Sequence, residues 1–286
     1  MTLRLGITSP IVTRVPGVAG DWEQNAGIDE LAAIAEAADR LGFDHLTCSE
    51  HVVVPVDVAA QRGSTYWDPL ATLGFLAART RNIRLVTQVL VLGYHHPLEI
   101  AKRYGTLDRV SGGRLVLGVG VGSLAEEFEL LGAQFAGRGE IADDALRALR
   151  SAWGRERPAY SGAHFEFSDI VVDPHGVRTE VPVWVGGRTP RSLRRAVELG
   201  NGWVPFGLDL EALTEMLQRV EPPAAFDVVL GTGRPVDPID DPVRTADRLR
   251  RIGEAGATVA GVTIAATSAE HYLDQLEALA ALNLQD

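Results

Sequence analysis

Short apolar runs alternate along the chain with segments in which apolar residues recur every three or four positions. The first pattern is typical of strands buried on both faces, and the second of helices that bury one face. Within residues 28–41, for example, Leu31, Ile34 and Ala38 share one side of a predicted helix. The apolar runs predict strands at residues 3–7, 45–49, 83–92, 114–119, 181–185, 203–206, 226–230 and 259–265.

A predicted helix follows each of these strands. Asp68 and Pro69 suit the cap and the first turn of one helix, and Pro97 begins the next. The helices are expected at residues 28–41, 68–77, 97–112, 142–153, 190–199, 209–220, 243–254 and 269–281. Between the fourth and fifth strands, residues 123–141 predict a loop with a short helix, and residues 159–173 predict a hairpin.

This order of elements favours an α/β protein of the (β/α)₈ type, because right-handed βα units repeated in this way close into a barrel. We therefore predict a TIM barrel with an insertion after the fourth strand. An open, doubly wound sheet is the alternative that the strand count disfavours. No linker, low-complexity tract or block of charge divides the chain, so residues 1–286 are expected to form a single domain.

Composition narrows the possible partners and compartments. The net charge of −11 argues against binding to nucleic acid or to an anionic membrane. No apolar run approaches the roughly 18 residues that a membrane helix needs, and residues 1–7 resemble a strand more than a signal segment, so we expect a cytoplasmic protein. The single cysteine, Cys48, excludes an intramolecular disulfide, and its place in a strand predicts an inert core residue.

The loop Gly186-Gly187-Arg188-Thr189 joins the fifth predicted strand to its helix. In such barrels ligands bind on the loops that follow the strands. Glycine lets the backbone approach a ligand closely, and the free amides of a helix N-terminus attract anions. Arg188, Arg191, Arg194 and Arg195 add four cations within eight residues. The segment predicts a phosphate site, and the alternative is a tight turn followed by a solvated helix face.

Ser49-Glu50-His51 follows the second predicted strand. Histidine is the natural proton donor near neutral pH, so its position at the barrel mouth makes His51 a candidate catalytic residue. Glu50 is the candidate that tunes His51, although neighbouring residues on a strand point in opposite directions. Packing or capping is the alternative role for His51.

Two other histidine motifs and one glycine motif suggest structural roles. His95-His96 has no third ligand at a spacing that suits a metal, so capping and packing are expected there, and also at Asp173-Pro174-His175. The sequence GVGVG at residues 118–122 lacks the G-x-G-x-x-G spacing of a dinucleotide site and follows a fourth strand, not a first. We expect these glycines to let a planar ring lie against bare backbone.

Three stretches resemble the luciferase-like monooxygenase superfamily, and within it the oxidoreductases that depend on the deazaflavin coenzyme F420. They are residues 80–90 (TRNIRLVTQVL), 108–120 (DRVSGGRLVLGVG) and 183–187 (VWVGG). The run from serine to glycine at residues 111–120 is highly specific. The resemblance extends from residue 3 to about residue 206 and so covers most of the chain.

The resemblance implies a barrel with an excursion after the fourth strand and an FMN or F420 ring across its mouth. It implies a cis peptide bond between Gln88 and Val89 behind the ring, and it places the phosphate on the loop after the fifth strand. It also implies an acidic residue and a histidine after the second strand, here Glu50 and His51, and a homodimer. Cofactor contacts are accordingly expected from Ser49, Gln88, Val89, Gly120, Ser123, Glu126, Gly186, Gly187, Arg188, Thr189, Arg191 and Pro205.

The chain departs from the sugar-phosphate dehydrogenases of this family at one position. Those enzymes carry a catalytic glutamate just after the fourth-strand glycine motif, where this chain has Ser123, followed by Glu126 and Glu127. They also hold the sugar phosphate partly with lysines, whereas Lys102 is the single lysine here and belongs to the third helix. We therefore expect a different substrate.

The resulting hypothesis is an F420-dependent oxidoreductase that passes hydride between the coenzyme and a small organic substrate, with His51 as proton donor or substrate orienter. The cluster of arginines suits the long anionic tail of F420, which FMN lacks. One alternative is an FMN-dependent monooxygenase that takes reduced flavin from a separate reductase. Another is a non-catalytic barrel that only binds a cofactor.

Overall fold

The computed structural model describes residues 3–282, and its parallel strands close into a barrel. The last strand in the chain pairs with the first, and the fourth pairs with the fifth, so the sheet has no open edge. The barrel strands are β1 (Arg4–Ile7), β3 (His45–Cys48), β5 (Arg84–Thr87), β7 (Leu115–Gly120), β10 (Val183–Gly186), β11 (Gly202–Val204), β12 (Asp227–Gly231) and β13 (Val259–Val262). This closure confirms the predicted barrel and excludes the open sheet.

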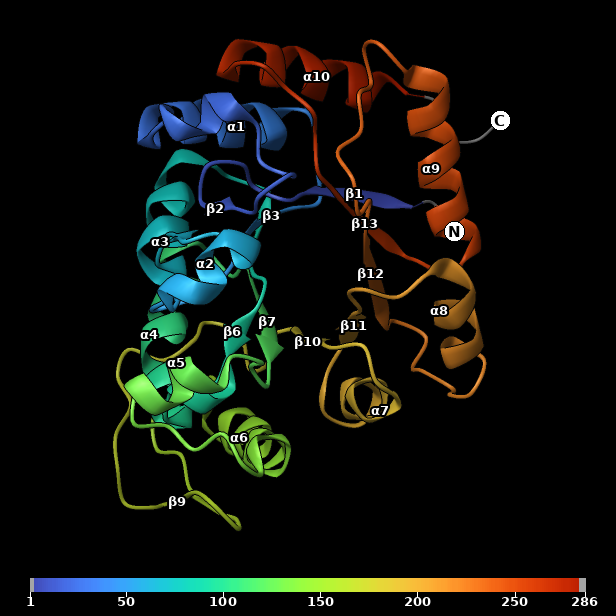
Figure 1. Cartoon of the computed structure of the whole chain (residues 1–286). Helices are drawn as coiled ribbons and strands as arrows, with labels where there is room; N and C mark the ends of the chain where they lie inside the picture. Colours follow the sequence, from blue (N-terminus) through green and yellow to red (C-terminus); the bar gives the residue numbers. More distant parts are fainter. Residues whose placement is uncertain (1–2, 283–286) are drawn as a thin grey trace.

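Helices surround the barrel (Figure 1). Their buried residues are mainly apolar and belong to the core that they share with the strands. The helices are α1 (Ile28–Arg40), α3 (Pro69–Arg79), α4 (Pro97–Val110), α6 (Arg138–Ala152), α7 (Pro190–Leu199), α8 (Leu210–Leu217), α9 (Pro242–Glu254) and α10 (Ala269–Ala281). Asp68 caps α3 as predicted, since its carboxylate accepts a hydrogen bond from Ala71 N at 2.8 Å. Among the described residues no helix is both long enough and apolar enough to cross a bilayer.

Helix α6 begins four residues before its predicted start at residue 142. Its first turn contains Gly139, and glycine is unfavourable inside a helix. This turn also shows no apolar periodicity that would predict a helix. The Gly139 carbonyl instead accepts a hydrogen bond from Arg195 of α7 at 2.8 Å. The first turn of α6 is therefore tied to α7 by a contact that the local sequence does not show.

The predicted strand at residues 83–92 is interrupted in the structure. It consists of β5, a short β6 (Leu90–Val91) that also pairs with β7, and a 3₁₀ turn η2 (Leu92–Tyr94). The bond between Gln88 and Val89 at the interruption is cis, as the family resemblance implied. A continuous apolar run gives no local sign of such a break, because both parts are buried.

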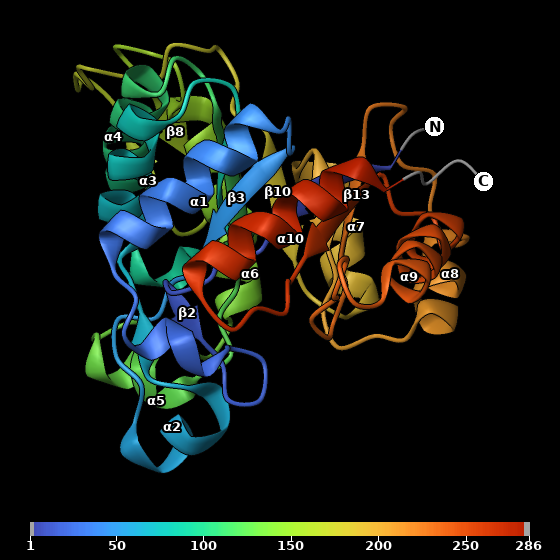
Figure 2. The same ribbon diagram turned by 90° about the horizontal axis from the view of Figure 1, so that it is seen from above.

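Short elements on the loops complete the fold. The expected hairpin is present as β8 (Tyr160–Ser161) and β9 (Glu166–Phe167), and the expected short helix as α5 (Ala125–Leu130). The sequence analysis missed the antiparallel pair β2 (Thr13–Arg14) and β4 (Thr65–Tyr66), the turn η1 (Asp21–Gln24) and the helix α2 (Val56–Arg62). In Figure 2, α2, α5 and β2 lie together at one end of the molecule, where the loops after β3 and β7 meet.

The core has an inner and an outer layer. Inside the barrel, Trp184 packs with five valines from other strands, namely Val86, Val116, Val204, Val229 and Val259. Larger apolar side chains fill the layer between the strands and the helices. Cys48 belongs to this outer layer, and burial raises the pKa of its thiol to about 12. Its thiol therefore stays protonated, as expected for an inert core residue.

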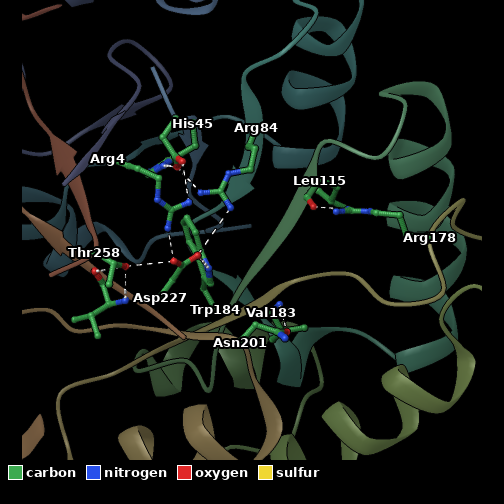
Figure 3. A network of polar contacts seen from close by, with 12 residues as sticks. Arg4, His45, Arg84, Leu115, Arg178, Val183, Trp184, Asn201, Asp227 and Thr258 are labelled. Carbon is green, nitrogen blue, oxygen red and sulfur yellow. Dashed lines mark hydrogen bonds and ion pairs between the residues drawn. The ribbon is translucent and has the colours of Figure 1, made fainter. Parts of the chain in front are cut away.

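A polar network crosses the barrel near the N-terminal ends of the strands (Figure 3). Asp44 contacts Arg84 and accepts hydrogen bonds from Arg4 at 3.1 Å and from His45 Nδ1 at 2.8 Å. Asp227 in turn contacts Arg4 and accepts a hydrogen bond from the Trp184 indole at 3.2 Å. These side chains occupy the floor of the barrel, so ligands must approach from the opposite end.

The floor network predicts a pH-dependent stability. Burial would raise the pKa of Asp44, but hydrogen bonds and opposite charge from His45 and Arg84 lower it to about 2. A lowered folded pKa stabilises the protein above the unfolded value of 3.8, and this stabilisation is lost as the pH falls towards 2. We expect a loss of about 2 kcal/mol in the free energy of unfolding over that range.

Urea unfolding at several pH values measures this loss. The Asp44→Asn variant should lack the extra acid sensitivity of the wild-type protein, because it has no carboxylate to protonate. Asp274→Asn, at an exposed position on α10, is the matched control and should behave like the wild type. Equal pH dependence in the wild type and in Asp44→Asn would contradict the assignment.

Candidate active site

A cavity of about 310 Å³ lies at the C-terminal ends of the strands, where barrels of this kind bind their ligands. We call it the central cavity. It brings together predicted site residues from loops that are far apart in the sequence, namely Ser49, Glu50, His51, Gln88, Val89, Gly120, Ser123, Gly186 and Gly187. The other predicted cofactor contacts, Glu126, Arg188, Thr189, Arg191 and Pro205, lie outside its wall.

The Gln88–Val89 segment forms one wall of the central cavity. The Ser49 hydroxyl donates a hydrogen bond to the Gln88 carbonyl at 2.7 Å, which ties this segment to the loop after β3. The Val89 side chain fits against two glycines, because a Cβ on Gly120 or on Gly186 would lie 2.7 or 2.9 Å from its methyl groups. Bare backbone is required here, and the chain's own valine occupies part of the space that we had expected a planar ring to use.

His51 is held by a buried carboxylate. Its Nδ1 lies 2.6 Å from Oε2 of Glu127, which also accepts a hydrogen bond from the Tyr94 hydroxyl at 2.7 Å. The other Glu127 oxygen accepts the backbone N–H of Val52 at 2.6 Å. The ring of Tyr66 packs edge-on against His51 with the ring centres 4.5 Å apart. The imidazole orientation is thus determined on two sides.

Glu127 remains ionised although its side chain is fully buried. Burial by itself would raise the pKa of Glu127, but the hydrogen bonds from His51 and Tyr94 outweigh it and hold the pKa below its ordinary value. Because a carboxylate only accepts hydrogen bonds, Nδ1 of His51 is the donor, and Nε2 is the ring nitrogen left for a ligand. This arrangement suits a group that exchanges a proton with a bound molecule.

Glu50 does not make the contact that the sequence suggested. One of its oxygens accepts the Val91 N–H at 2.7 Å, and the other lies 2.7 Å from Nε2 of His95. Burial would lower the pKa of His95, but the Glu50 carboxylate outweighs that effect and raises it. The carboxylate that contacts His51 is therefore Glu127, because neighbouring residues after a strand point in different directions.

Sequence reasoning did not single out Glu127 as the carboxylate that contacts His51. Glu127 lies on α5 between the exposed Glu126 and the buried Phe128, and the sequence AEEFEL offers three glutamates without a local signal that separates them. In the structure Glu127 is buried and Glu126 is exposed. Ser123, just before α5, accepts a hydrogen bond from Arg62 of α2 at 3.1 Å, so both helices cover the same side of the cavity.

The loop after β10 leads from the cavity wall to the N-terminus of α7. Thr189 caps this helix, since its hydroxyl accepts the Ser192 N–H at 3.2 Å. Arg195 is buried against Asp143 of α6, and Arg191 lies 3.6 Å from the same carboxylate. Two of the four arginines thus already have an acidic partner, which the local sequence did not show. Arg188 and Arg194 are exposed and form no ion pair within residues 3–282.

The comparison with known families agrees with this geometry. Residues 3–280 match the family described as luciferase-like monooxygenase. The chain belongs to this family. It is 29% identical to an uncharacterized protein of Mycobacterium tuberculosis over 87% of this chain and 92% of that protein. It is also 30% identical to an F420-dependent glucose-6-phosphate dehydrogenase of Microbacterium testaceum, over 75% of this chain and 62% of that enzyme.

Solved structures of the same fold use different cofactors. A monooxygenase from Streptomyces bottropensis has a TM-score of 0.78 at 22% identity and covers 99% of both chains. An F420-dependent secondary alcohol dehydrogenase has a TM-score of 0.76 at 15% identity over 100% of both chains. A diketocamphane monooxygenase of Pseudomonas putida in complex with FMN has a TM-score of 0.72 at 16% identity over 98% of both chains. At these identities the likeness concerns the fold.

A flavin-type cofactor fits this barrel mouth. Gly120 and Gly186 line one wall of the central cavity with Val89, whose side chain lies against both glycines, so a flat ring would pack against Val89. The N-terminus of α7 begins beside that wall, and the exposed Arg188 stands there as a cation for a phosphate group. The residues present therefore supply both a surface for a ring and a site for an anion.

Proposed function

We propose that this protein is an oxidoreductase that uses coenzyme F420 to pass hydride to or from a small organic substrate. The observation that carries the proposal is His51, which lines the cavity and is oriented by a buried, ionised glutamate. Bound F420 would supply the hydride chemistry. The similarity to an F420-dependent dehydrogenase at 30% identity supports this choice of cofactor.

The chain's own residues would position the reactants and move a proton. His51 would exchange a proton with the substrate oxygen through Nε2, while Glu127 keeps the ring turned towards the cavity. Gln88 and Val89 would support the coenzyme ring from behind, and the segment from Gly186 to Thr189 would hold its phosphate. Ser49, Gly120, Ser123, Glu126, Arg191 and Pro205 stay predictions as further cofactor contacts, as do the homodimer and the cytoplasmic location.

An FMN-dependent monooxygenase is the second candidate. It is favoured by the FMN-bound monooxygenase that shares this fold, and it would require reduced flavin from a separate reductase. A non-catalytic cofactor-binding barrel is the third, and turnover of any substrate would exclude it. His51 and its glutamate argue against the third candidate, because a barrel without chemistry has no need of an oriented imidazole.

Titration of the purified protein with F420 and, separately, with FMN tests the choice. Tryptophan fluorescence serves as the signal, since the chain has five tryptophans. Micromolar or tighter binding of F420, with FMN much weaker, is the expected result. The reverse preference would favour the FMN-dependent monooxygenase, and binding of neither cofactor would overturn the proposal.

Arginine replacement gives a sharper test of the cofactor. Replacing Arg188 and Arg191 together with alanine should weaken F420 binding by roughly tenfold or more, and FMN binding much less, because only F420 has a long anionic tail. Arg157→Ala, an exposed arginine near the β8–β9 hairpin, controls for the loss of positive charge. An equal loss of affinity for both cofactors would show that these arginines do not contact the tail.

A further inference from the structure

A second cavity of about 490 Å³ adjoins the central cavity and is larger than it. It lies between the ends of β11 and β12 and the N-terminal part of α8, and we call it the α8 cavity. The two cavities share Gln88, Val89 and Phe206 in their walls. A bound molecule can therefore extend from the side of His51 into the α8 cavity.

The α8 cavity has an aliphatic wall. Its main aliphatic side chains are Val204, Leu208, Leu210, Leu213 and Leu230, and the aromatic ring of Phe206 also contributes. Gln88 is the single polar side chain among the described residues that line it, and no ionisable group does so. Burial of a phosphate or carboxylate there without a partner would be strongly unfavourable, whereas apolar groups gain free energy on leaving water.

A positive charge lies at the rim of this cavity. A Cβ placed on Gly207 would lie 3.7 Å from Nη1 of Arg188, so the guanidinium stands beside the β11 loop and outside the aliphatic wall. An anionic cofactor group has its natural partner at that rim and at the α7 N-terminus. The interior of the α8 cavity then remains for the substrate.

A third cavity at the barrel mouth has a mixed wall. It is smaller, about 180 Å³, and apolar side chains such as Val15 and Val18 share its wall with hydroxyl groups and with the carboxylate of Glu23. An apolar ligand binds weakly to a wall with polar groups, because these groups lose their hydrogen bonds to water when the ligand covers them. Of the two cavities that adjoin the central one, the α8 cavity is thus the one suited to an apolar ligand.

We infer that the substrate is an uncharged, mainly aliphatic alcohol or carbonyl compound, whose hydrocarbon part occupies the α8 cavity while its reacting carbon lies beside His51. This inference rests on the proposed function for the identity of the reaction. In the direction of oxidation, the alcohol carbon would lose hydride to oxidised F420 and its oxygen would lose a proton to His51, which leaves a carbonyl compound and reduced F420. Reduction is the reverse of this step.

Calorimetric titration with heptan-2-one and with glucose 6-phosphate tests the inference. Both ligands are added to the cofactor-free protein and to protein saturated with oxidised F420. Heptan-2-one should bind in both states and glucose 6-phosphate in neither. Leu208→Gln should weaken heptan-2-one binding by about tenfold, because it places an amide in the aliphatic wall. Leu131→Gln, at an exposed leucine that directly follows α5 and lies outside that wall, should leave binding unchanged.

The outcomes separate this inference from the proposed function. Three results would overturn the assignment of the α8 cavity. They are a failure of heptan-2-one to bind, its equal binding to the wild type and to Leu208→Gln, and its displacement by F420. None of these results changes the affinity for F420 measured by tryptophan fluorescence. Loss of F420 binding would instead overturn the proposed function, and binding of heptan-2-one sensitive to Leu208→Gln would still support an aliphatic ligand.

Discussion

Replacement of His51 by alanine should lower the turnover number by about 10²–10⁴-fold, because the substrate loses the group that exchanges its proton. Cofactor affinity should change little, since the coenzyme is expected to be held by Val89 and by the loop after β10. Stopped-flow measurement of hydride transfer, with an aliphatic alcohol as substrate, gives the rate directly. An unchanged rate in His51→Ala would remove His51 from the mechanism.

Glu127 acts through His51, so its replacement should have a smaller and more specific effect. In Glu127→Gln the turnover number should fall by roughly tenfold or more while KM stays close to the wild-type value, because orientation of the imidazole is lost and the substrate pocket is kept. The ¹⁵N shifts of the His51 ring should also change, since the amide no longer requires Nδ1 to carry the proton.

Two controls distinguish positioning from a loss of structure. Glu127→Asp keeps the carboxylate and should restore part of the turnover number. Glu129→Gln changes an exposed glutamate two residues away on α5 and should leave both rate and ¹⁵N shifts unaltered. If Glu127→Gln altered stability and KM but not the His51 ring signals, the contact would be structural only.

Gly118→Ala should be the most destabilising small substitution in the barrel. A Cβ at this position would lie 1.9 Å from the carbonyl oxygen of Thr87, which is backbone and cannot turn aside. The clash lies between β7 and β5, so relief requires separation of paired strands. We expect a loss of about 3 kcal/mol or more in the free energy of unfolding, measured by urea or thermal denaturation.

Other glycines provide matched comparisons. A Cβ on Gly74 of α3 meets nothing within 4 Å, so Gly74→Ala should stabilise the protein by about 0.5–1 kcal/mol through helix propensity. A Cβ on Gly120 would clash with the Val89 side chain, which can be shortened. Val89→Ala should therefore rescue Gly120→Ala but not Gly118→Ala. A neutral Gly118→Ala would show that the strands are less tightly apposed than described.

These glycines illustrate where local interpretation of the sequence was incomplete. The motif at residues 118–122 indicated that bare backbone was needed at the barrel mouth, and this holds in the structure. The nearest neighbours of Gly118 and Gly120 are nevertheless Thr87 and Val89 of the same chain. Sequence alone identified the missing side chains but not the atoms that fill the space, because those atoms come from a segment about 30 residues earlier.

The arginines near α7 also have partners that the local sequence did not reveal. Four arginines in eight residues predicted an anion site, yet Asp143 of α6 contacts Arg195 and approaches Arg191. The acidic partners are about 50 residues away in sequence, so no local count of charges reveals them. Arg188, on the loop before α7, and Arg194, on the helix itself, keep the electrostatic character that the sequence suggested, because both are exposed to solvent.

Local patterns in the sequence were enough to predict the barrel, its order of strands and helices and most helix ends, because hydrophobic periodicity and capping residues act over a few positions. Likeness to the family located the cis bond between Gln88 and Val89. The folded chain was needed to see that Glu127, 76 residues from His51, contacts its ring, and that Glu50 contacts His95 instead. Such contacts depend on how closed strands bring distant loops together, and the same closure creates the aliphatic cavity beside α8.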